Sequence, residues 1–485
     1  MLRESMEQHF ILFAAHWIIQ LAVVIRVLLR PHREPASRVA WVAAITLVPV
    51  AGIIAYLLFG EVHLGRKRLE QHRKMLAQMP AFPVADAGSD NTTQPLFPEA
   101  RALLFETGSG INGFPAIGGN QVTLPEDSNA AINELVADID AAEAQVHLLF
   151  YIWLPDDNGC KVIEALRRAA RRGIVCRMMV DGLGSRQLLR SEHWQSLKRD
   201  GVHLAVALPL LNPLLRPFSG RFDLRNHRKL AVIDGRITYV GSQNCADPEF
   251  RIKARFAPWV DLMLRVEGPV ARQNLYVFMC DWTSATGEKL DDLLSQPVRA
   301  PDVGCTAQVV ATGPTGPPLA MPAMFVALLY SARREVVITT PYYVPDESIQ
   351  HAICSCALRG VDTTVVFPAR NDSWIVAAAS RSYYADLLAA GVKIFEYHGG
   401  LLHSKSFTMD GEITFIGSAN MDRRSFELNS ENNMLFCDAH VTALVRTRQE
   451  QYLARSVPVR RELVASWSLP HRLWNNTFAT LGPLL

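Results

Sequence analysis

The sequence has almost no excess of charge of either sign. Forty-nine Lys and Arg residues against 47 Asp and Glu leave a formal charge of +2 at pH 7. Proteins that bind nucleic acid through its phosphates usually carry a strong basic excess, so this balance argues against a nucleic-acid partner. Charged residues make up only 20% and hydrophobic residues 49% of the 485 positions. This composition excludes a disordered chain and suffices for the cores of two or three domains.

Cysteine pairs are also missing. The eight cysteines are scattered, without a Cys-X-X-Cys pair and without the spacing to His that zinc sites show. A disulfide framework and a structural zinc site are therefore not expected. Reduced thiols in an ordinary core are the better interpretation.

Long hydrophobic runs are confined to the first sixty residues. Residues 10–25 form one run, broken only by His16 and Gln20, and residues 39–59 form a second run without any charge. A signal peptide has a single short run, whereas two runs of this length predict a transmembrane helical hairpin over residues 1–62. The alternative is a buried hydrophobic hairpin in a soluble domain. His16 and Gln20 lie on one helix face, where we expect a hydrogen bond to the second helix.

Basic residues flank the two runs unequally. The link between the runs contains Arg26, Arg30, Arg33 and Arg38, and the outer flanks contain Arg3, Arg66, Lys67, Arg68, Arg73 and Lys74. The positive-inside rule then favours a cytoplasmic body.

Two segments outside the body have two interpretations each. The basic cluster from Arg66 to Lys74 either binds anionic lipid headgroups or only sets the topology. Residues 470–485 have apolar side chains near helical spacing, which either lie on the membrane interface or pack on the body. The apolar positions are Leu473, Trp474, Phe478, Leu481 and Leu484.

The rest of the chain contains one pattern twice. A linker over residues 63–119, which we expect to pack on the body, precedes helix and strand patterns at 130–144, 146–152, 159–172 and 174–180. The same order returns at 324–332, 336–340, 346–358 and 361–367. Strands separated by helices of this length indicate parallel pairing with helices on both faces. We therefore predict an α/β fold with a duplicated unit, in domains over residues 120–300 and 301–485.

Each unit ends in the same motif, His-X-Lys-X4-Asp-Gly followed by Gly-Ser-X-Asn. The two copies supply the candidate site residues His227, Lys229, Asp234, Ser242 and Asn244, and then His403, Lys405, Asp410, Ser418 and Asn420. Asp-Gly between two strand patterns predicts a tight hairpin. His and Lys are two residues apart on the strand before the turn, so they project from the same face. The strand after the turn returns Gly-Ser-X-Asn to the same end, where Gly-Ser N–H groups can approach a ligand.

Two such sets of His, Lys and Asn side chains facing one pocket are suited to bind and react with a phosphodiester. Lys side chains neutralise phosphoryl oxygens and stabilise the charge that builds in the transition state. One neutral His can attack phosphorus, while the other, protonated, gives its proton to the leaving alkoxide. A carboxylate behind each His fixes its tautomer, with Glu431 the candidate in the second half and Asp261 the matching candidate in the first. This scheme requires neither a metal nor a cofactor.

A single copy of the motif is a weak signal, because it more often lies on a solvent-facing strand. Two copies at matching places resemble the paired motifs of the phospholipase D superfamily, and the whole chain is similar to the bacterial cardiolipin synthases of that superfamily. Residues 56–61, 64–68, 259–263, 266–269, 380–384 and 420–426 also carry the resemblance. One departure is Gln243, where cardiolipin synthases often have Met before the Asn.

The resemblance implies two fused pseudo-twofold phospholipase D-like α/β/α domains behind the membrane hairpin, with one site at their interface. It also implies a covalent phosphatidyl-histidine intermediate, formed on His227, with His403 as acid and base. Asp234 and Asp410 are implied to orient or stabilise the site. The expected location is the cell inner membrane, as a multi-pass protein.

The function expected from this resemblance is cardiolipin synthesis. The enzyme would transfer a phosphatidyl group from one phosphatidylglycerol to another and release glycerol, so its partner is anionic phospholipid. A phospholipase D-type hydrolase and a synthase using phosphatidylethanolamine as co-substrate are alternatives. A nuclease of the same superfamily and a non-catalytic membrane scaffold are more remote ones.

Overall fold

The computed structural model describes residues 2–30, 35–60, 70, 74–75, 79, 82, 94–209, 223–294 and 304–480. The chain divides into two compact units, one made of Met1–Leu69, Leu211–Asp223 and Pro483–Leu485, the other of Glu70–Leu210 and Leu224–Gly482. The basic residues at positions 66–68 and 73, most of the predicted linker, and Leu481 and Leu484 lie outside the described residues. We describe the two units separately.

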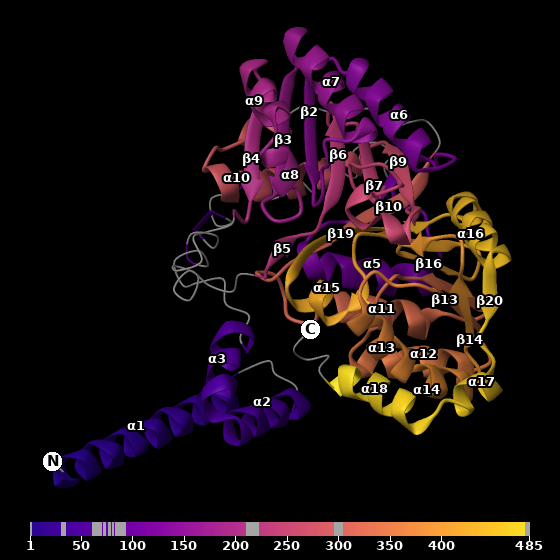
Figure 1. Ribbon diagram of the computed structural model, residues 1–485. Coiled ribbons are helices and arrows are strands. Elements are labelled where there is room, and N and C mark those ends of the chain that lie inside the picture. The colour runs from indigo at the N-terminus through magenta and orange to yellow at the C-terminus, as the bar shows by residue number, and fades with distance from the viewer. Residues whose placement is uncertain are drawn as a thin grey trace. The chain divides into compact units, whose positions relative to one another are not determined.

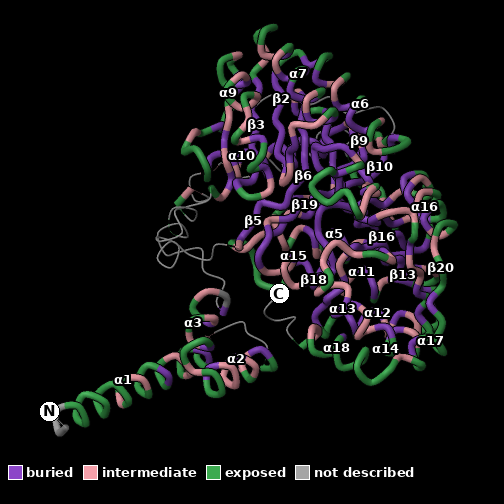
Figure 2. Tube along the Cα trace, in the orientation of Figure 1, coloured by how far each residue is buried: buried purple, intermediate pink, exposed green. Residues whose placement is uncertain are grey.

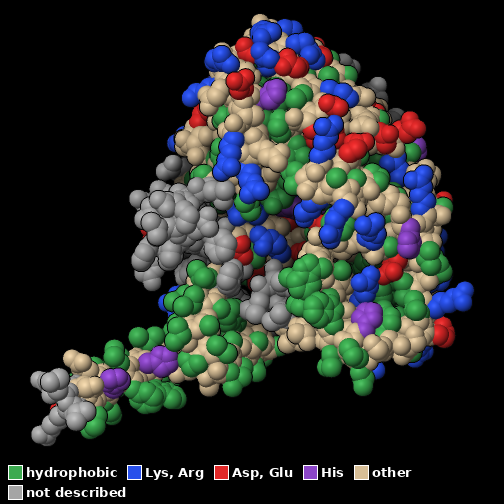
Figure 3. All heavy atoms as spheres, in the orientation of Figure 1, with side chains coloured by type: hydrophobic (Ala, Val, Ile, Leu, Met, Phe, Trp, Pro, Cys, Tyr) green, Lys and Arg blue, Asp and Glu red, His purple; other side chains and the backbone are tan. Residues whose placement is uncertain are grey.

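The first predicted membrane helix is present as α1, Leu2–Leu29. Its apolar stretch Ser5–Leu29 has 25 residues, about 37 Å of helix, which exceeds the roughly 30 Å of a bilayer core. Hydrophobic side chains are displayed along it (Figure 3). Gln20 is buried, and its Nε2 donates a hydrogen bond to the Ile45 carbonyl at 2.9 Å. The predicted polar contact with the second apolar run is thereby confirmed for Gln20.

The second run does not form the single span that we predicted. It is divided into α2, Pro35–Leu47, and α3, Pro49–Phe59. A residue before proline is driven away from helical angles, and Val48 has φ −131° and ψ 71°. The bend is sharp, since the Trp41 and Tyr56 ring centroids lie 5.3 Å apart. The two helices, about 20 and 16 Å long, are each shorter than a bilayer core.

The larger unit is built on one continuous β-sheet that runs through both halves of the body (Figure 1). In spatial order, the first half contributes β4 His203–Ala207, β3 Val175–Asp181, β2 Gln145–Phe150, β6 Lys229–Ile233, β7 Ile237–Gly241, β9 Met263–Glu267 and β1 Ile117–Thr123. The second half continues with β10 Cys305–Thr312, β19 Asn429–Cys437, β17 Ile413–Gly417, β16 Ser406–Met409, β11 Glu335–Thr339, β13 Asp362–Pro368, β14 Lys393–Tyr397 and β20 Ser456–Pro458.

The two halves repeat one topology. In each half three strands are parallel, β2-β3-β4 and β11-β13-β14, and the next strands pair antiparallel. The halves join where β1 pairs antiparallel with β10, Ile117 opposite Ala307. The predicted duplicated α/β fold is confirmed, whereas the domain boundaries at 119 and 300 stay predictions.

Helices cover both faces of the sheet, and the strands between them are buried (Figure 2). On one face of the first half lie α6 Ser128–Asp140 and α7 Asp157–Arg171, and in the second half α11 Ala320–Ser331 and α12 Glu347–Leu358. The other face carries α10 Ala271–Thr286 and α16 Ala439–Ala454. Within β2, Leu148 and Leu149 enter different core clusters, as the two-residue period of a strand dictates.

Further elements complete the body. They are α5 Glu99–Asn112, α8 Arg186–Leu189, α9 Glu192–Arg199, α13 Trp374–Ser382, α14 Tyr384–Ala389, α15 Arg423–Glu427, α17 Arg461–Ala465, α18 Leu469–Thr480, the 3-10 helices η4 Arg251–Phe256 and η5 Asp291–Leu294, and the short strands β12 Tyr343–Val344 and β18 Met421–Asp422.

Two very short strand pairs connect the halves. The strand β5, Arg225–Asn226, pairs with β19 of the second half, and β8, Trp259–Val260, pairs with β15, Leu401–Leu402. Each of the two motif histidines directly follows one of these strands. The interface between the halves therefore fixes the backbone on which both histidines are carried.

Candidate active site

His227 lies between β5 and β6 and is held by the second half. Its backbone N–H donates to the Ser430 carbonyl at 2.9 Å. Its Nδ1 lies 3.0 Å from each carboxylate oxygen of Glu431. Because an ionised carboxylate only accepts hydrogen bonds, Nδ1 carries the proton and Nε2 is the basic nitrogen.

His403 is held in the same way by the first half. Its backbone N–H donates to the Val260 carbonyl at 2.9 Å, and its Nδ1 lies 2.6 Å from Asp261 Oδ1. Its Nε2 is therefore also the basic nitrogen of the ring.

The structure corrects the pairing that the sequence suggested. We had assigned each carboxylate to the His of its own half, but Glu431 binds His227 and Asp261 binds His403. The two carboxylates are the predicted ones, with their partners exchanged. Each half-site is thus incomplete without the other half, and the two histidines belong to one site.

The two lysines are buried and donate to their own histidines. Lys229 Nζ bonds the His227 carbonyl and Lys405 Nζ bonds the His403 carbonyl, both at 2.6 Å. Burial lowers the pKa of Lys229 well below its usual value and that of Lys405 to about 8, against the raising effect of the nearby carboxylates. The charge of Lys405 also lowers the pKa of Lys229 and of His227, so the two ammonium groups lie within electrostatic range of each other.

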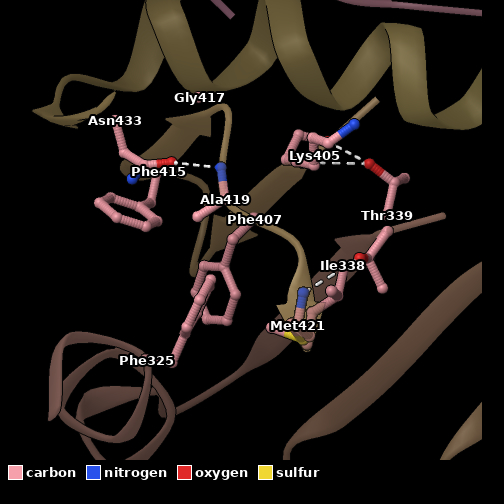
Figure 4. A pocket seen from close by; sticks show the side chains of 12 residues that line it. Phe325, Ile338, Thr339, Lys405, Phe407, Phe415, Gly417, Ala419, Met421 and Asn433 are labelled. Carbon is pink, nitrogen blue, oxygen red and sulfur yellow. Dashed lines mark hydrogen bonds between the residues drawn. The ribbon is translucent and has the colours of Figure 1, made fainter. Parts of the chain in front are cut away.

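A small pocket lies beside Lys405 (Figure 4). Its walls are largely apolar, including Phe325, Phe407 and Phe415, and the Lys405 ammonium points away from these rings. The Asn433 Oδ1 in the wall accepts a hydrogen bond from the Ala419 N–H at 3.2 Å. Burial of the Lys405 side chain as a whole deprives the ammonium of hydration, which is the physical cause of its lowered pKa.

The serines of the Gly-Ser segments orient the carboxylates. The Ser242 hydroxyl donates to Asp261 Oδ1 at 2.6 Å, and the Ser418 hydroxyl donates to Glu431. Their backbone N–H groups donate to the Leu262 and Asn432 carbonyls at 2.8 and 3.0 Å. These N–H groups are therefore occupied within the sheet, and our expectation that they approach a ligand is wrong.

The two motif asparagines are both almost fully buried, but they differ in hydrogen bonding. Asn244 Oδ1 accepts the Ile152 N–H at 3.1 Å. Asn420 Oδ1 is buried without a hydrogen-bond partner among the described residues. A buried unpaired polar atom costs free energy and is a natural contact for a substrate group.

The motif aspartates lie away from the histidines. Lys229 is the first residue of β6 and Asp234 directly follows its last, so about 16 Å of strand separates the two residues. Its carboxylate accepts the N–H groups of residues 143–145 at 2.8–2.9 Å. Asp410 accepts three N–H groups of residues 333–335 and the guanidinium of Arg101. Both were counted among the residues of the catalytic motif, with the implied role of orienting or stabilising the site; in the structure they anchor the turns before β2 and β11.

Aromatic rings beside the histidines were not singled out from the sequence. The Tyr151 ring lies 4.9 Å from the His227 ring and 5.4 Å from Lys229 Nζ. The Trp259 ring lies 4.6 Å from the His403 ring. The position of Trp259 two residues before Asp261 was a signal that could have indicated it, whereas Tyr151 carried none.

Burial decides the charge of the imidazoles. Loss of hydration lowers the pKa of His227 to about 4, despite the opposing effect of Glu431. Burial also lowers the pKa of His403, against the raising effect of Asp261. Both rings are therefore neutral near pH 7, and an anionic phosphate between them would raise the pKa of each. Two oriented imidazoles and two buried ammonium groups can exchange one substituent on phosphorus for another.

Comparisons with known proteins agree with this geometry. Residues 135–255 and 325–453 match the family described as "Cardiolipin synthase, PLD-like domain", and residues 18–61 match "Phospholipase D-nuclease N-terminal". The chain is 38% identical to "Cardiolipin synthase A" of Yersinia pseudotuberculosis serotype O:3 (strain YPIII), over 97% of each chain. It is 37% identical to "Cardiolipin synthase A" of Yersinia pestis, with the same coverage.

A solved structure shows the same fold. The phosphatidylserine synthase of Haemophilus influenzae Rd KW20 aligns with a TM-score of 0.55 and 14% identity. The alignment covers 78% of this chain and 97% of that one.

Proposed function

Because the chain belongs to the phospholipase D-like cardiolipin synthases, a family of phosphatidyltransferases, we propose that it joins two molecules of phosphatidylglycerol into cardiolipin and releases glycerol. The observation that carries this proposal is the exchange of carboxylates between the halves. It orients two imidazoles through Nδ1 and leaves each Nε2 without a carboxylate partner, which supports the action of both rings on one phosphorus atom.

In the first step the neutral His227 Nε2 attacks the phosphorus of one phosphatidylglycerol. A nitrogen–phosphorus bond forms and the bond from phosphorus to the glycerol oxygen breaks. His403, which takes up a proton at Nε2 when the bound anionic phosphate raises its pKa, gives that proton to the glycerol oxygen. The enzyme then holds a phosphatidyl group on His227, and glycerol leaves.

In the second step His403 acts as the base. It takes the proton from a primary hydroxyl of a second phosphatidylglycerol, whose oxygen attacks the phosphorus and displaces His227. The reaction returns both imidazoles to their starting states. The assignment of nucleophile and acid follows the resemblance, since the two half-sites have nearly the same geometry.

Lys229 and Lys405 stabilise the charge on the phosphoryl oxygens. An ammonium group in a buried site stabilises developing charge more than in water, because little solvent competes for it. We propose that the Asn244 and Asn420 amides bind the same phosphate, and that Ser242 and Ser418 support it through the carboxylates. Asp234 and Asp410 act only through the turn that they anchor.

Exclusion of water from the site decides whether the phosphatidyl group is transferred to a second lipid or hydrolysed. Both histidines and both lysines are buried, with Lys229 fully inaccessible. A second lipid hydroxyl competes with water for the phosphatidyl-histidine only if water is scarce there. This burial favours a transferase over a phospholipase D-type hydrolase.

The protein is membrane-associated, and we propose that it lies in the inner membrane of the cell with the catalytic body in the cytoplasm. A multi-pass arrangement requires the bend at Val48 to open, so that α2 and α3 end to end return across the bilayer. Single cysteines at Ala36 and Val175, both exposed, would test it with a membrane-impermeant thiol reagent. Labelling of Ala36→Cys alone from outside intact cells supports two crossings, and equal labelling of both contradicts them.

The decisive test uses purified protein and labelled phosphatidylglycerol. We expect cardiolipin and glycerol, and a phosphatidyl adduct that mass spectrometry locates on His227 and that accumulates in His403→Ala. Phosphatidic acid without cardiolipin would identify a hydrolase. Cardiolipin formed only when phosphatidylethanolamine is added would identify the other co-substrate.

A further inference from the structure

The C-terminal helix α18 presents a group of large apolar side chains to solvent. Leu469, Leu473 and Trp474 of this helix are 72%, 67% and 53% exposed, and Trp374 at the start of α13 is 58% exposed. We call these four residues the apolar ridge. Single exposed apolar residues are ordinary, whereas a contiguous exposed apolar group is typical of an interaction site.

The ridge is a packed structure. The Trp374 and Trp474 rings stack with centroids 5.6 Å apart, and Phe478 packs edge-on against both, at 5.0 and 4.7 Å. The helices α13 and α18 lie side by side (Figure 1). The C-terminal segment thus packs on the body through one side, while Leu469 and Leu473, one helical turn apart, stay exposed.

Cationic side chains lie next to the ridge. The 3-10 helix η4 carries Arg251, Lys253 and Arg255, and all three are exposed. This helix is fixed against the segment that leads into Trp374, because Lys253 pairs with Asp372 and Arg370 donates to the Arg255 carbonyl at 3.2 Å. Apolar and aromatic residues bordered by cations are the composition of a surface that lies in the headgroup region of an anionic bilayer.

The same segments border the active site. The Phe250 ring, immediately before η4, stacks on Trp259 at 4.0 Å, and Trp259 lies 4.6 Å from His403. On the other side, Asp372 accepts the Tyr342 hydroxyl at 2.6 Å, and the charge of His403 influences the pKa of Asp372. The ridge is thus connected to the catalytic histidine through the backbone from Trp374 to Asp372, the Lys253–Asp372 ion pair of η4, and the stack of Phe250, Trp259 and His403.

We propose that the apolar ridge and η4 form a second membrane-contact surface, which binds an anionic phospholipid bilayer and holds the entrance of the site at the headgroups. The inference rests on the proposed function in so far as the substrate is a lipid. It goes beyond the anchoring by α1, because an anchor keeps the chain at a membrane but does not orient the body.

Photo-crosslinking tests the contact directly. The full-length chain would carry a benzophenone amino acid at Leu473 or, as a control, at Leu358, which is 73% exposed. Leu358 lies before the first residue of β13, and Trp374 of the ridge lies after its last residue. About 20 Å of strand therefore separates the control position from the ridge. The protein would be placed in vesicles of phosphatidylcholine with or without phosphatidylglycerol.

We expect lipid adducts at position 473, enriched in the vesicles with phosphatidylglycerol, and few at position 358. Equal adducts at both positions, or none at 473, would overturn the proposal. Equal adducts with and without phosphatidylglycerol would show that the cations of η4 do not bind anionic headgroups. A crosslink to a second copy of the chain would assign the ridge to self-association. The His227→Ala variant should give the same adducts, so a failure of the docking proposal is distinguishable from a failure of the catalytic one.

Kinetics provide a second measurement. Leu469→Ser with Leu473→Ser removes exposed side chains that support little of the fold. We expect the ratio of activity on bilayer phosphatidylglycerol to activity on a monomeric short-chain analogue to fall roughly tenfold. Leu358→Ser should leave this ratio unchanged, and an unchanged ratio in the double variant would contradict the proposal.

Discussion

Glu431 of the second half holds the imidazole of His227 of the first half, with each carboxylate oxygen 3.0 Å from Nδ1. The reciprocal pair, Asp261 with His403, is closer at 2.6 Å. The two pairs cross the same interface in opposite directions. Orientation of both catalytic rings therefore depends on the docking of the two halves, and a disturbance of that docking would inactivate both rings together.

Replacement of Glu431 should damage catalysis more than folding. In Glu431→Gln the amide can still accept the Nδ1 hydrogen bond but supplies no negative charge to stabilise an imidazolium. We expect the rate of cardiolipin formation to fall roughly 100-fold or more. The melting temperature should fall modestly as well, because His227, Ser418 and Asn429 lose a charged acceptor. The matched control is Glu192→Gln on the exposed surface of α9, which should change neither.

The stability of the protein should fall as the pH is lowered from about 6.5 towards 4. An unfolded His titrates near 6.5, whereas burial lowers the pKa of His227 to about 4 in the folded protein. Between these values the unfolded chain binds more protons, so folding is weakened by up to about 1.4 kcal/mol per pH unit. Melting curves should show that His227→Gln loses less stability than the wild type over this interval. An equal loss in both proteins would contradict the lowered pKa.

Activity should also fall above about pH 8. Burial lowers the pKa of Lys405 to about 8, so the ammonium group loses its charge as the pH rises through that value and binds the phosphate less well. A bound anion raises the pKa of the ammonium, so kcat/KM should decline at a lower pH than kcat. Lys405→Met should be slow at every pH and lack this decline. A decline that persists in the variant would assign it to another group.

Asp410→Asn should destabilise the protein without removing the chemistry. The carboxylate accepts three backbone N–H groups and the Arg101 guanidinium, and loss of such charge-assisted bonds costs about 1–3 kcal/mol. We expect a lower melting temperature with much of kcat retained at low temperature. His403→Asn should show the opposite pattern. Complete loss of activity in a stable Asp410→Asn protein would instead show that Asp410 takes part in catalysis directly.

Local steric rules made much of the site predictable from the sequence. The Asp-Gly pairs indicated tight hairpins, and the turn residues Asp234, Gly235, Asp410 and Gly411 all have positive φ, from 52° to 75°, as such turns require. The two-residue strand period placed His and Lys together. The break at Val48 was also local, since it follows from Pro49, but the continuous hydrophobicity of the run hid it.

The tertiary structure alone decided which groups meet. His227 and Glu431 are 204 residues apart in the chain, and their contact depends on the antiparallel pairing of β1 with β10, which turns one half towards the other. Hydropathy and spacing act over one element and are the same in both halves, so they cannot distinguish a carboxylate that serves its own half from one that serves the other. The sequence therefore determined the chemical groups of the site and their local order, and the docking of the halves determined their partners.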